Sequence, residues 1–183
     1  MQVQDVEHYL ALLDQALVDL GVQTPVSVIL LGGAYILITL NSRRMTQDID
    51  VLALIGGEAD HATGLPLAVA LYQATQIVAQ KQQLDPHWLN TIRAAALQPP
   101  GIPVRRILWK QYMLLYVYLP EQAYVLVQKL CINRRKDRQD ILALFQALGI
   151  KTRAQAQELV DRYVTPEEQQ QLHLSLIVHS YFP

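Results

Sequence analysis

The sequence predicts an α/β (α+β) fold in which a small mixed β-sheet is flanked by helices and followed by a helical C-terminal region. Short apolar runs of strand length, broken by glycine, occupy the first two thirds of the chain. Apolar residues at helical spacing dominate the last third. We therefore expect a core over residues 1–119 and a helical region over residues 120–183 that packs on this core.

The composition is that of an ordinary globular protein, with 51% hydrophobic and 17% charged residues among 183. The formal net charge of -1 gives no general attraction for nucleic acid or acidic lipid, so a polyanion site would have to be a local patch. Cys131 is the only cysteine, and the N-terminus lacks the pattern of a secretory signal. The longest apolar stretch, residues 28–40, is too short to span a bilayer. These features predict a cytoplasmic protein without membrane association.

The N-terminal segments alternate between helical and strand patterns. Residues 6–20 place apolar side chains at helical spacing, which predicts a helix. Residues 26–31 are a β-rich apolar run that ends at Gly32-Gly33. The apolar segment 34–40 follows directly. We expect a strand, a tight glycine turn and a short buried helix.

The middle of the chain predicts one strand and two helices. Residues 48–54 alternate and then become wholly apolar, as in a strand with one functional end. A helix is expected over about residues 65–81. Asp85 and Pro86 match the start of a further helix that extends to about residue 97.

The last third is mainly helical. Residues 104–108 have strand character, and residues 113–119 fit either a strand or an aromatic helix. Helices are predicted over residues 121–132 and 138–148. The patterns T-x-x-Q and T-P-E-E are capping boxes that predict two more helix starts, at Thr152 and Thr165.

The segment GGAYILITLNSRRMTQDIDVL carries the candidate chemistry. Side chains two residues apart on a strand project to the same face, so Asp48 and Asp50 can converge on one cation. Two carboxylates that share substrate phosphate oxygens suit Mg²⁺. Gly32 and Gly33 let the backbone approach a phosphate at a helix N-terminus. The alternative is a glycine turn followed by solvated, loop-capping aspartates.

A strand, Gly-Gly, a helix and Asp-Ile-Asp on a strand resemble the nucleotidyltransferase (DNA polymerase beta-like) superfamily. Further along, Trp88-Leu89-Asn90 and QKLCINRRKDRQDILAL resemble the bacterial group that includes the AbiEii-type toxins. The resemblance spans about residues 26–148 and implies the nucleotidyltransferase fold. It also implies attack of an acceptor hydroxyl on the α-phosphorus of a nucleoside triphosphate, with pyrophosphate leaving.

The resemblance implies a role for each matching residue. Asp48 and Asp50 would bind Mg²⁺ or Mn²⁺. Lys129 would be a point charge for phosphate, and Asp137 would orient Lys129 or act near the acceptor. The expected catalytic residues are therefore Asp48, Asp50, Lys129 and Asp137. The expected nucleotide-binding residues are Gly32, Gly33, Arg44, Thr46 and Lys129. Lys129 also fits a lysine that lays its stem over a core and keeps its ammonium in water.

Two functions stay open, because catalytic members of the superfamily carry a third carboxylate on a later strand and residues 104–108 contain none. The first is metal-dependent transfer of a nucleotidyl group to an RNA or protein acceptor, as the toxin of a toxin–antitoxin pair with a cognate antitoxin. The alternative is a catalytically degenerate module that binds a nucleotide or a protein. A basic cluster fits either a patch for triphosphate or RNA or a solvated linker; it comprises Arg134, Arg135, Lys136 and Arg138.

Overall fold

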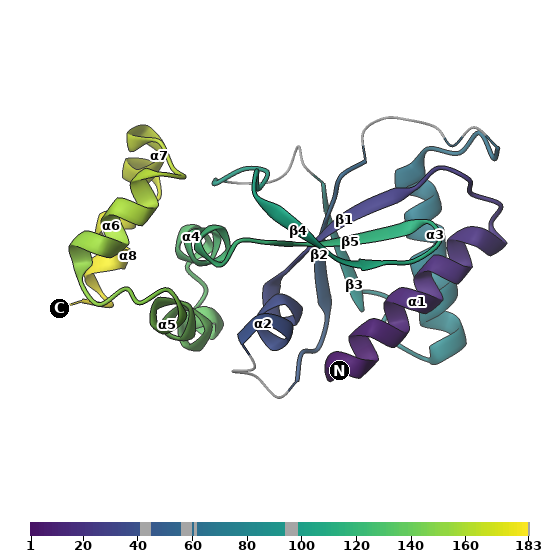
Figure 1. Ribbon diagram of the computed structural model, residues 1–183, viewed down its shortest axis with the longest axis horizontal. Coiled ribbons are helices and arrows are strands. Elements are labelled where there is room, and N and C mark those ends of the chain that lie inside the picture. Colours follow the sequence, from purple (N-terminus) through teal and green to yellow (C-terminus); the bar gives the residue numbers. More distant parts are fainter. Residues whose placement is uncertain (41–44, 56–59, 61, 94–98, 183) are drawn as a thin grey trace. The chain divides into compact units, whose positions relative to one another are not determined.

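The computed structural model describes residues 1–40, 45–55, 60, 62–93 and 99–182 and shows a mixed α/β structure (Figure 1). Five strands form one open sheet in the order β3-β2-β1-β5-β4. The predicted mixed fold class is therefore confirmed. The chain divides into two compact units, which are Met1–Ala95 with Arg106–Leu119, and Ala96–Arg105 with Pro120–Pro183.

The sheet is mixed in direction, because β1 runs antiparallel to β2 but parallel to β5, and β2 runs parallel to β3. The central strand β1 is almost wholly buried, as its continuous apolar run predicts. The strands are β1 (Val26–Leu31), β2 (Ile49–Ala53), β3 (Leu89–Arg93), β4 (Arg106–Gln111) and β5 (Leu115–Pro120). Residues 113–119 thus contain a strand, whereas β4 covers only the second half of the strand expected at 104–108.

In the described part of the first unit, three helices accompany the sheet: α1 (Val3–Asp19), α2 (Gly32–Leu40) and α3 (Leu67–Gln82). α1 and α3 lie side by side in Figure 1 and pack against each other. α1 buries an apolar stripe at helical spacing, namely Val6, Leu10, Leu13 and Leu17. α2 is apolar but only nine residues long. No helix in the described part of the chain is long and apolar enough to cross a membrane.

Asp14 fixes α1 to the turn that connects β4 and β5. Its carboxylate accepts hydrogen bonds from the backbone N–H groups of Leu114 at 2.7 Å, Leu115 at 2.8 Å and Met113 at 3.2 Å. Asp14 is only 8% exposed, so these bonds replace the water that a buried carboxylate would lose. The N-terminal helix is thereby joined to a segment about a hundred residues later.

The helix predicted after Asp85 is wrong, because β3 begins there. The Asp85 carboxylate accepts a hydrogen bond from the backbone N–H of His87 at 2.7 Å, and its carbonyl accepts one from Trp88 at 2.9 Å. An aspartate that bonds two residues ahead forms a turn instead of capping a helix. Trp88 is then buried, and its indole N–H donates to the Thr75 carbonyl on α3 at 3.1 Å. The predicted residues 94–97 lie outside the described part.

The second unit is helical, as the periodicity predicts. Its helices are α4 (Gln122–Ile132), α5 (Arg138–Ala147), α6 (Arg153–Asp161), α7 (Pro166–Gln171) and α8 (Leu174–His179), with a 3₁₀ turn η2 (Arg135–Asp137) before α5. Both capping boxes are confirmed, since the Thr152 side chain accepts from Gln155 N–H and the Thr165 side chain accepts from Glu168 N–H. Residues 99–105, which precede β4, belong to this unit.

Candidate functional site

Asp48, Asp50 and Asn90 lie together where β2 and β3 begin. Asp50 stands opposite Asn90 in the parallel pairing, so both side chains project from the same face of the sheet. The Asn90 Nδ2 atom donates to Asp48 Oδ2 at 3.0 Å and to Asp50 Oδ1 at 3.3 Å. The two carboxylates therefore converge on one amide nitrogen.

Gly32 brings the start of α2 against this pair. Leu31 pairs with Asp50 across β1 and β2, and the chain then turns at Gly32 with φ +61°. A Cβ atom at Gly32 would lie 2.8 Å from Asp50 Cγ and would collide with the carboxylate. Only glycine tolerates both the positive φ and this approach. The partly exposed Gly33 follows in the first turn of α2, where the backbone N–H groups of a helix have no intrahelical partner and favour negative charge.

Thr46 shapes the backbone just ahead of the aspartates. It is 5% exposed, and its hydroxyl donates to the Asp48 carbonyl at 2.9 Å. Its own N–H donates to the Met1 carbonyl at 2.9 Å. Thr46 thus holds the segment from which Asp48 projects. Arg44, the other nucleotide ligand predicted for this segment, lies outside the described residues.

Lys129 and Asp137 meet in a buried ionic cluster of the second unit. Lys129 Nζ lies 2.7 Å from Asp137 Oδ1 and 2.9 Å from Asp140 Oδ2, and the three side chains are 4%, 4% and 2% exposed. Arg134 Nε reaches the other oxygen of Asp137 at 3.0 Å. Burial alone would raise the pKa of Asp137, but Lys129 and Arg134 together hold this pKa below its usual value.

This pairing determines what Lys129 can contact. Two of the three hydrogens of the Lys129 ammonium are directed to Asp137 and Asp140, so a phosphate would have to compete with two buried carboxylates.

The basic cluster defined above is accessible, unlike Lys129. Its four side chains are all exposed, namely those of Arg134, Arg135, Lys136 and Arg138. Arg138 also lies over the ring of Tyr181, 5.0 Å from its centroid.

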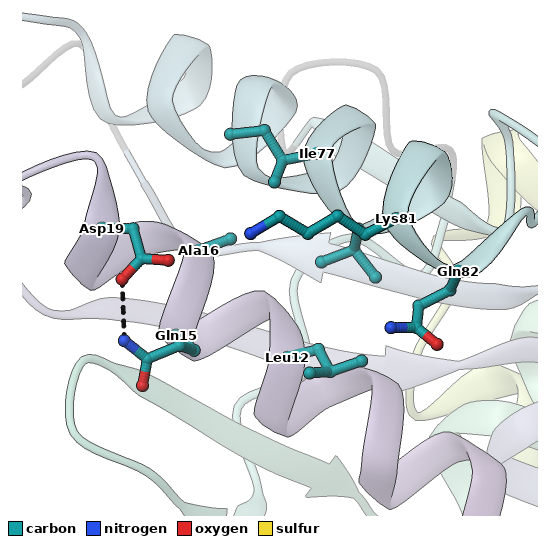
Figure 2. Close-up of a pocket in the computed structure, with 8 residues that line it drawn as sticks. Leu12, Gln15, Ala16, Asp19, Ile77, Lys81 and Gln82 are labelled. Atoms are coloured by element: carbon teal, nitrogen blue, oxygen red, sulfur yellow. Dashed lines mark hydrogen bonds between the residues drawn. The ribbon is translucent and has the colours of Figure 1, made fainter.

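A small cavity between α1 and α3 contains none of the predicted site residues. Figure 2 shows Lys81 extending across it from α3 and Asp19 on α1 accepting a hydrogen bond from Gln15 at 2.8 Å. Its volume of about 50 Å³ is far below the roughly 300–1,000 Å³ of typical ligand pockets. This cavity is too small for a nucleotide.

The aspartate pair suits a cation whose coordination is completed by a substrate, because the described part of the chain alone supplies too few ligands to surround it. In the described residues, no group of three or more His, Cys, Asp or Glu side chains is placed to hold a metal ion. The available donors are the carboxylate oxygens of Asp48 and Asp50 and the amide of Asn90. Mg²⁺ commonly binds through one or two carboxylates plus water and phosphate oxygens. Because Gly32 has no side chain, the backbone at the start of α2 can approach the Asp50 carboxylate.

Asn90 was not among the predicted site residues. Asp85 and Pro86 suggested the start of a helix, and on a helix Asn90 would have had no fixed relation to Asp50. The parallel register of β2 and β3 is what brings the two side chains together. The one available signal was the position of Asn90 in the Trp88-Leu89-Asn90 motif.

Comparison of the chain with protein-family models, with curated proteins and with solved structures finds no match.

Proposed function

We propose that this chain is a Mg²⁺- or Mn²⁺-dependent nucleotidyltransferase that moves a nucleotidyl group from a nucleoside triphosphate to a hydroxyl of an RNA or protein acceptor. One observation carries the proposal. The carboxylates of Asp48 and Asp50 converge on Asn90 directly beside the backbone of Gly32, at the start of a helix. Carboxylates for a cation and backbone N–H groups for phosphate are thereby adjacent.

Each residue of the first unit has a separate task in this proposal. Asp48 and Asp50 hold the divalent cation, which neutralises charge that develops on the phosphoryl oxygens. Gly32 lets the Asp50 carboxylate lie against the start of α2. Gly33, in the first turn of α2, leaves the backbone N–H groups without a bulky side chain beside them, so phosphate oxygens can approach. Thr46 keeps the backbone carrying Asp48 in place through its bond to the Asp48 carbonyl.

The second unit contributes a buried cluster and an exposed one. Lys129 is proposed to hold the carboxylates of Asp137 and Asp140 in position, because its ammonium is already bonded to both. The exposed basic cluster of this unit is proposed to contact the phosphates of an RNA acceptor. A role as the toxin of a toxin–antitoxin pair, with a cognate antitoxin as partner, is supported by the motif resemblance alone.

The second candidate function is a degenerate module that binds nucleotide without transfer. It is favoured by Asn90, a neutral residue at the position opposite Asp50 on the neighbouring strand. Catalytic members of the superfamily that the motif resembles carry a third carboxylate on a later strand, and an amide cannot replace its charge.

The test combines thermal unfolding with a transfer assay, using the wild type, Asp50→Asn and the exposed control Asp19→Asn. We expect each productive nucleoside triphosphate to stabilise the wild type only with Mg²⁺, by about 2.7 kcal/mol at a hundredfold excess over its dissociation constant. Asp50→Asn should lose this shift, and Asp19→Asn should keep it. Labelled α-phosphate should then pass to an acceptor.

The outcomes separate the two functions. Nucleotide stabilisation without any transfer to RNA or protein would favour the binding module. A shift that survives in Asp50→Asn would contradict both proposals, because it would place the nucleotide elsewhere.

A further inference from the structure

Asn90 is an uncharged side chain that bonds both aspartates. Its Nδ2 carries two hydrogens, and the structure places one acceptor from each aspartate at that nitrogen, at 3.0 and 3.3 Å. The amide thus lies between two like charges with its positive end toward both. The carbonyl oxygen is at the other end of the same planar group.

The orientation of this amide depends on what occupies the aspartate pair. Two nearby carboxylates repel each other, and the N–H groups of an amide relieve this repulsion. A divalent cation between the carboxylates reverses the local charge. It would repel the N–H groups and attract the carbonyl oxygen, which is a ligand type that hard cations accept. Rotation about the terminal torsion of asparagine exchanges the two ends, and this torsion has a broad energy profile.

We propose that Asn90 is the third protein ligand of the cation and changes roles by turning its amide. Without a cation its N–H groups hold Asp48 and Asp50 together, and with a cation its carbonyl oxygen joins the coordination. This inference rests on the proposed metal-dependent function, and it assigns the position of the missing third carboxylate to β3, not to the strand around residues 104–108.

The register of the sheet supports this assignment. β3 is the strand next to β2 on the side away from β1, and Asn90 is its residue opposite Asp50. β4, which includes part of residues 104–108, lies at the other edge of the sheet. Asn90 and both aspartates are only partly buried, so a solvated cation can reach them.

The test measures Mn²⁺ affinity by electron paramagnetic resonance, without nucleotide or turnover. The variants are Asn90→Leu, which removes both ends of the amide, and Asn90→Asp, which supplies a permanent oxygen ligand. Thr91→Val is the matched control, because Thr91 is the next residue on β3 and projects to the opposite face. Asp50→Asn tests the metal site itself. Circular dichroism and unfolding midpoints check that each variant folds.

We expect Asn90→Leu to raise the Mn²⁺ dissociation constant by roughly tenfold or more, the size of effect seen for residues that orient metal ligands. Asn90→Asp should lower this constant below the wild-type value. Without metal, the Asn90→Asp variant should unfold at a lower temperature than the wild type, because it places a third negative charge beside the two aspartates. Addition of Mn²⁺ should restore its unfolding midpoint. Thr91→Val should match the wild type in affinity.

Two results would overturn the inference in distinguishable ways. If Asp50→Asn loses Mn²⁺ but a folded Asn90→Leu binds it as the wild type does, the metal site stands and Asn90 is not a ligand. Weaker Mn²⁺ binding by a folded Asn90→Asp than by the wild type would likewise exclude Asn90 as a ligand. If the wild type does not bind Mn²⁺, or Asp50→Asn binds it equally well, the metal-dependent function fails and the role of Asn90 with it.

Discussion

At the scale of single residues, Gly32 and Gly149 show two different reasons why a position requires glycine: a positive φ, and a lack of space for a side chain. Both have a positive φ, +61° and +67°, but a Cβ atom meets Asp50 at the first position and no described atom within 4 Å at the second. Alanine at Gly149 should destabilise by about 1 kcal/mol because of its backbone alone. Gly32→Ala should destabilise clearly more, since the methyl group displaces the Asp50 carboxylate. Urea denaturation of both variants measures the difference.

The same pair of variants also tests the site. Gly32→Ala should weaken Mn²⁺ binding, whereas Gly149→Ala should not. Equal losses of stability and unchanged Mn²⁺ binding in both variants would show that Gly32 serves only a turn.

Residue types at short spacing were predictable from sequence, whereas contacts between strands were not. The spacing predicted that Asp48 and Asp50 would face the same way, and both bond Asn90 although Asp48 lies one residue before β2. Asn90 reaches them only through the register of two strands about forty residues apart. A single sequence contains no signal for such a register.

At the scale of elements, the cluster of Lys129, Asp137 and Asp140 joins α4, η2 and α5. Removing one partner of a buried ion pair leaves an uncompensated charge and typically destabilises by about 3–5 kcal/mol. We expect Lys129→Met to fall in this range. Lys151→Met, at an exposed lysine of the same unit, should change stability by only about 0.5 kcal/mol or less. If Lys129→Met lost as little stability as Lys151→Met, the buried ion pairs would not explain Lys129, and a role in phosphate binding would be favoured.

The cluster also predicts how stability depends on pH. The folded pKa of Asp137 is below its usual value of 3.8, so its contribution is complete above that value and is lost as the pH falls through the folded pKa. In Lys129→Met, Asp137 loses the ammonium but keeps Arg134, so burial should raise its pKa above the wild-type value. The difference in unfolding free energy between the wild type and the variant should therefore shrink as the pH falls. Unfolding curves of both proteins between pH 7 and pH 4 measure this difference, and a difference that grows on acidification would contradict the prediction.

Element types were predictable where local signals agree with packing. The glycine-bounded strand β1 and the two capping boxes follow directly from sequence. Asp85 gave the wrong prediction because the same side-chain bond to a backbone N–H serves both helix caps and turns. The burial of Trp88 against α3 favours the turn, and burial depends on the tertiary fold.

At the scale of the whole molecule, the formal charge of -1 means that any RNA acceptor must be held locally. We expect the double variant Arg135→Glu with Lys136→Glu to weaken binding of a single-stranded RNA strongly. Lys81→Glu with Lys151→Glu makes the same change in net charge at two other exposed lysines and should have little effect. Fluorescence anisotropy at several salt concentrations measures both, and the wild-type affinity should fall with salt.

Equal weakening by the two double variants would mean that RNA responds only to net charge. No RNA binding by the wild type would leave a protein as the acceptor.

The position of β1 in the sheet has a consequence for synthesis on the ribosome. β1 pairs with β2, which follows soon after, and with β5, which begins at Leu115. At about 5–20 residues per second, the ribosome needs roughly 4–17 s to add the 84 residues from Leu31 to Leu115. During that interval one edge of the most apolar strand has no partner, and exposed strand edges promote association between chains. The nascent first unit is therefore expected to be most prone to association between chains before Leu115 is added.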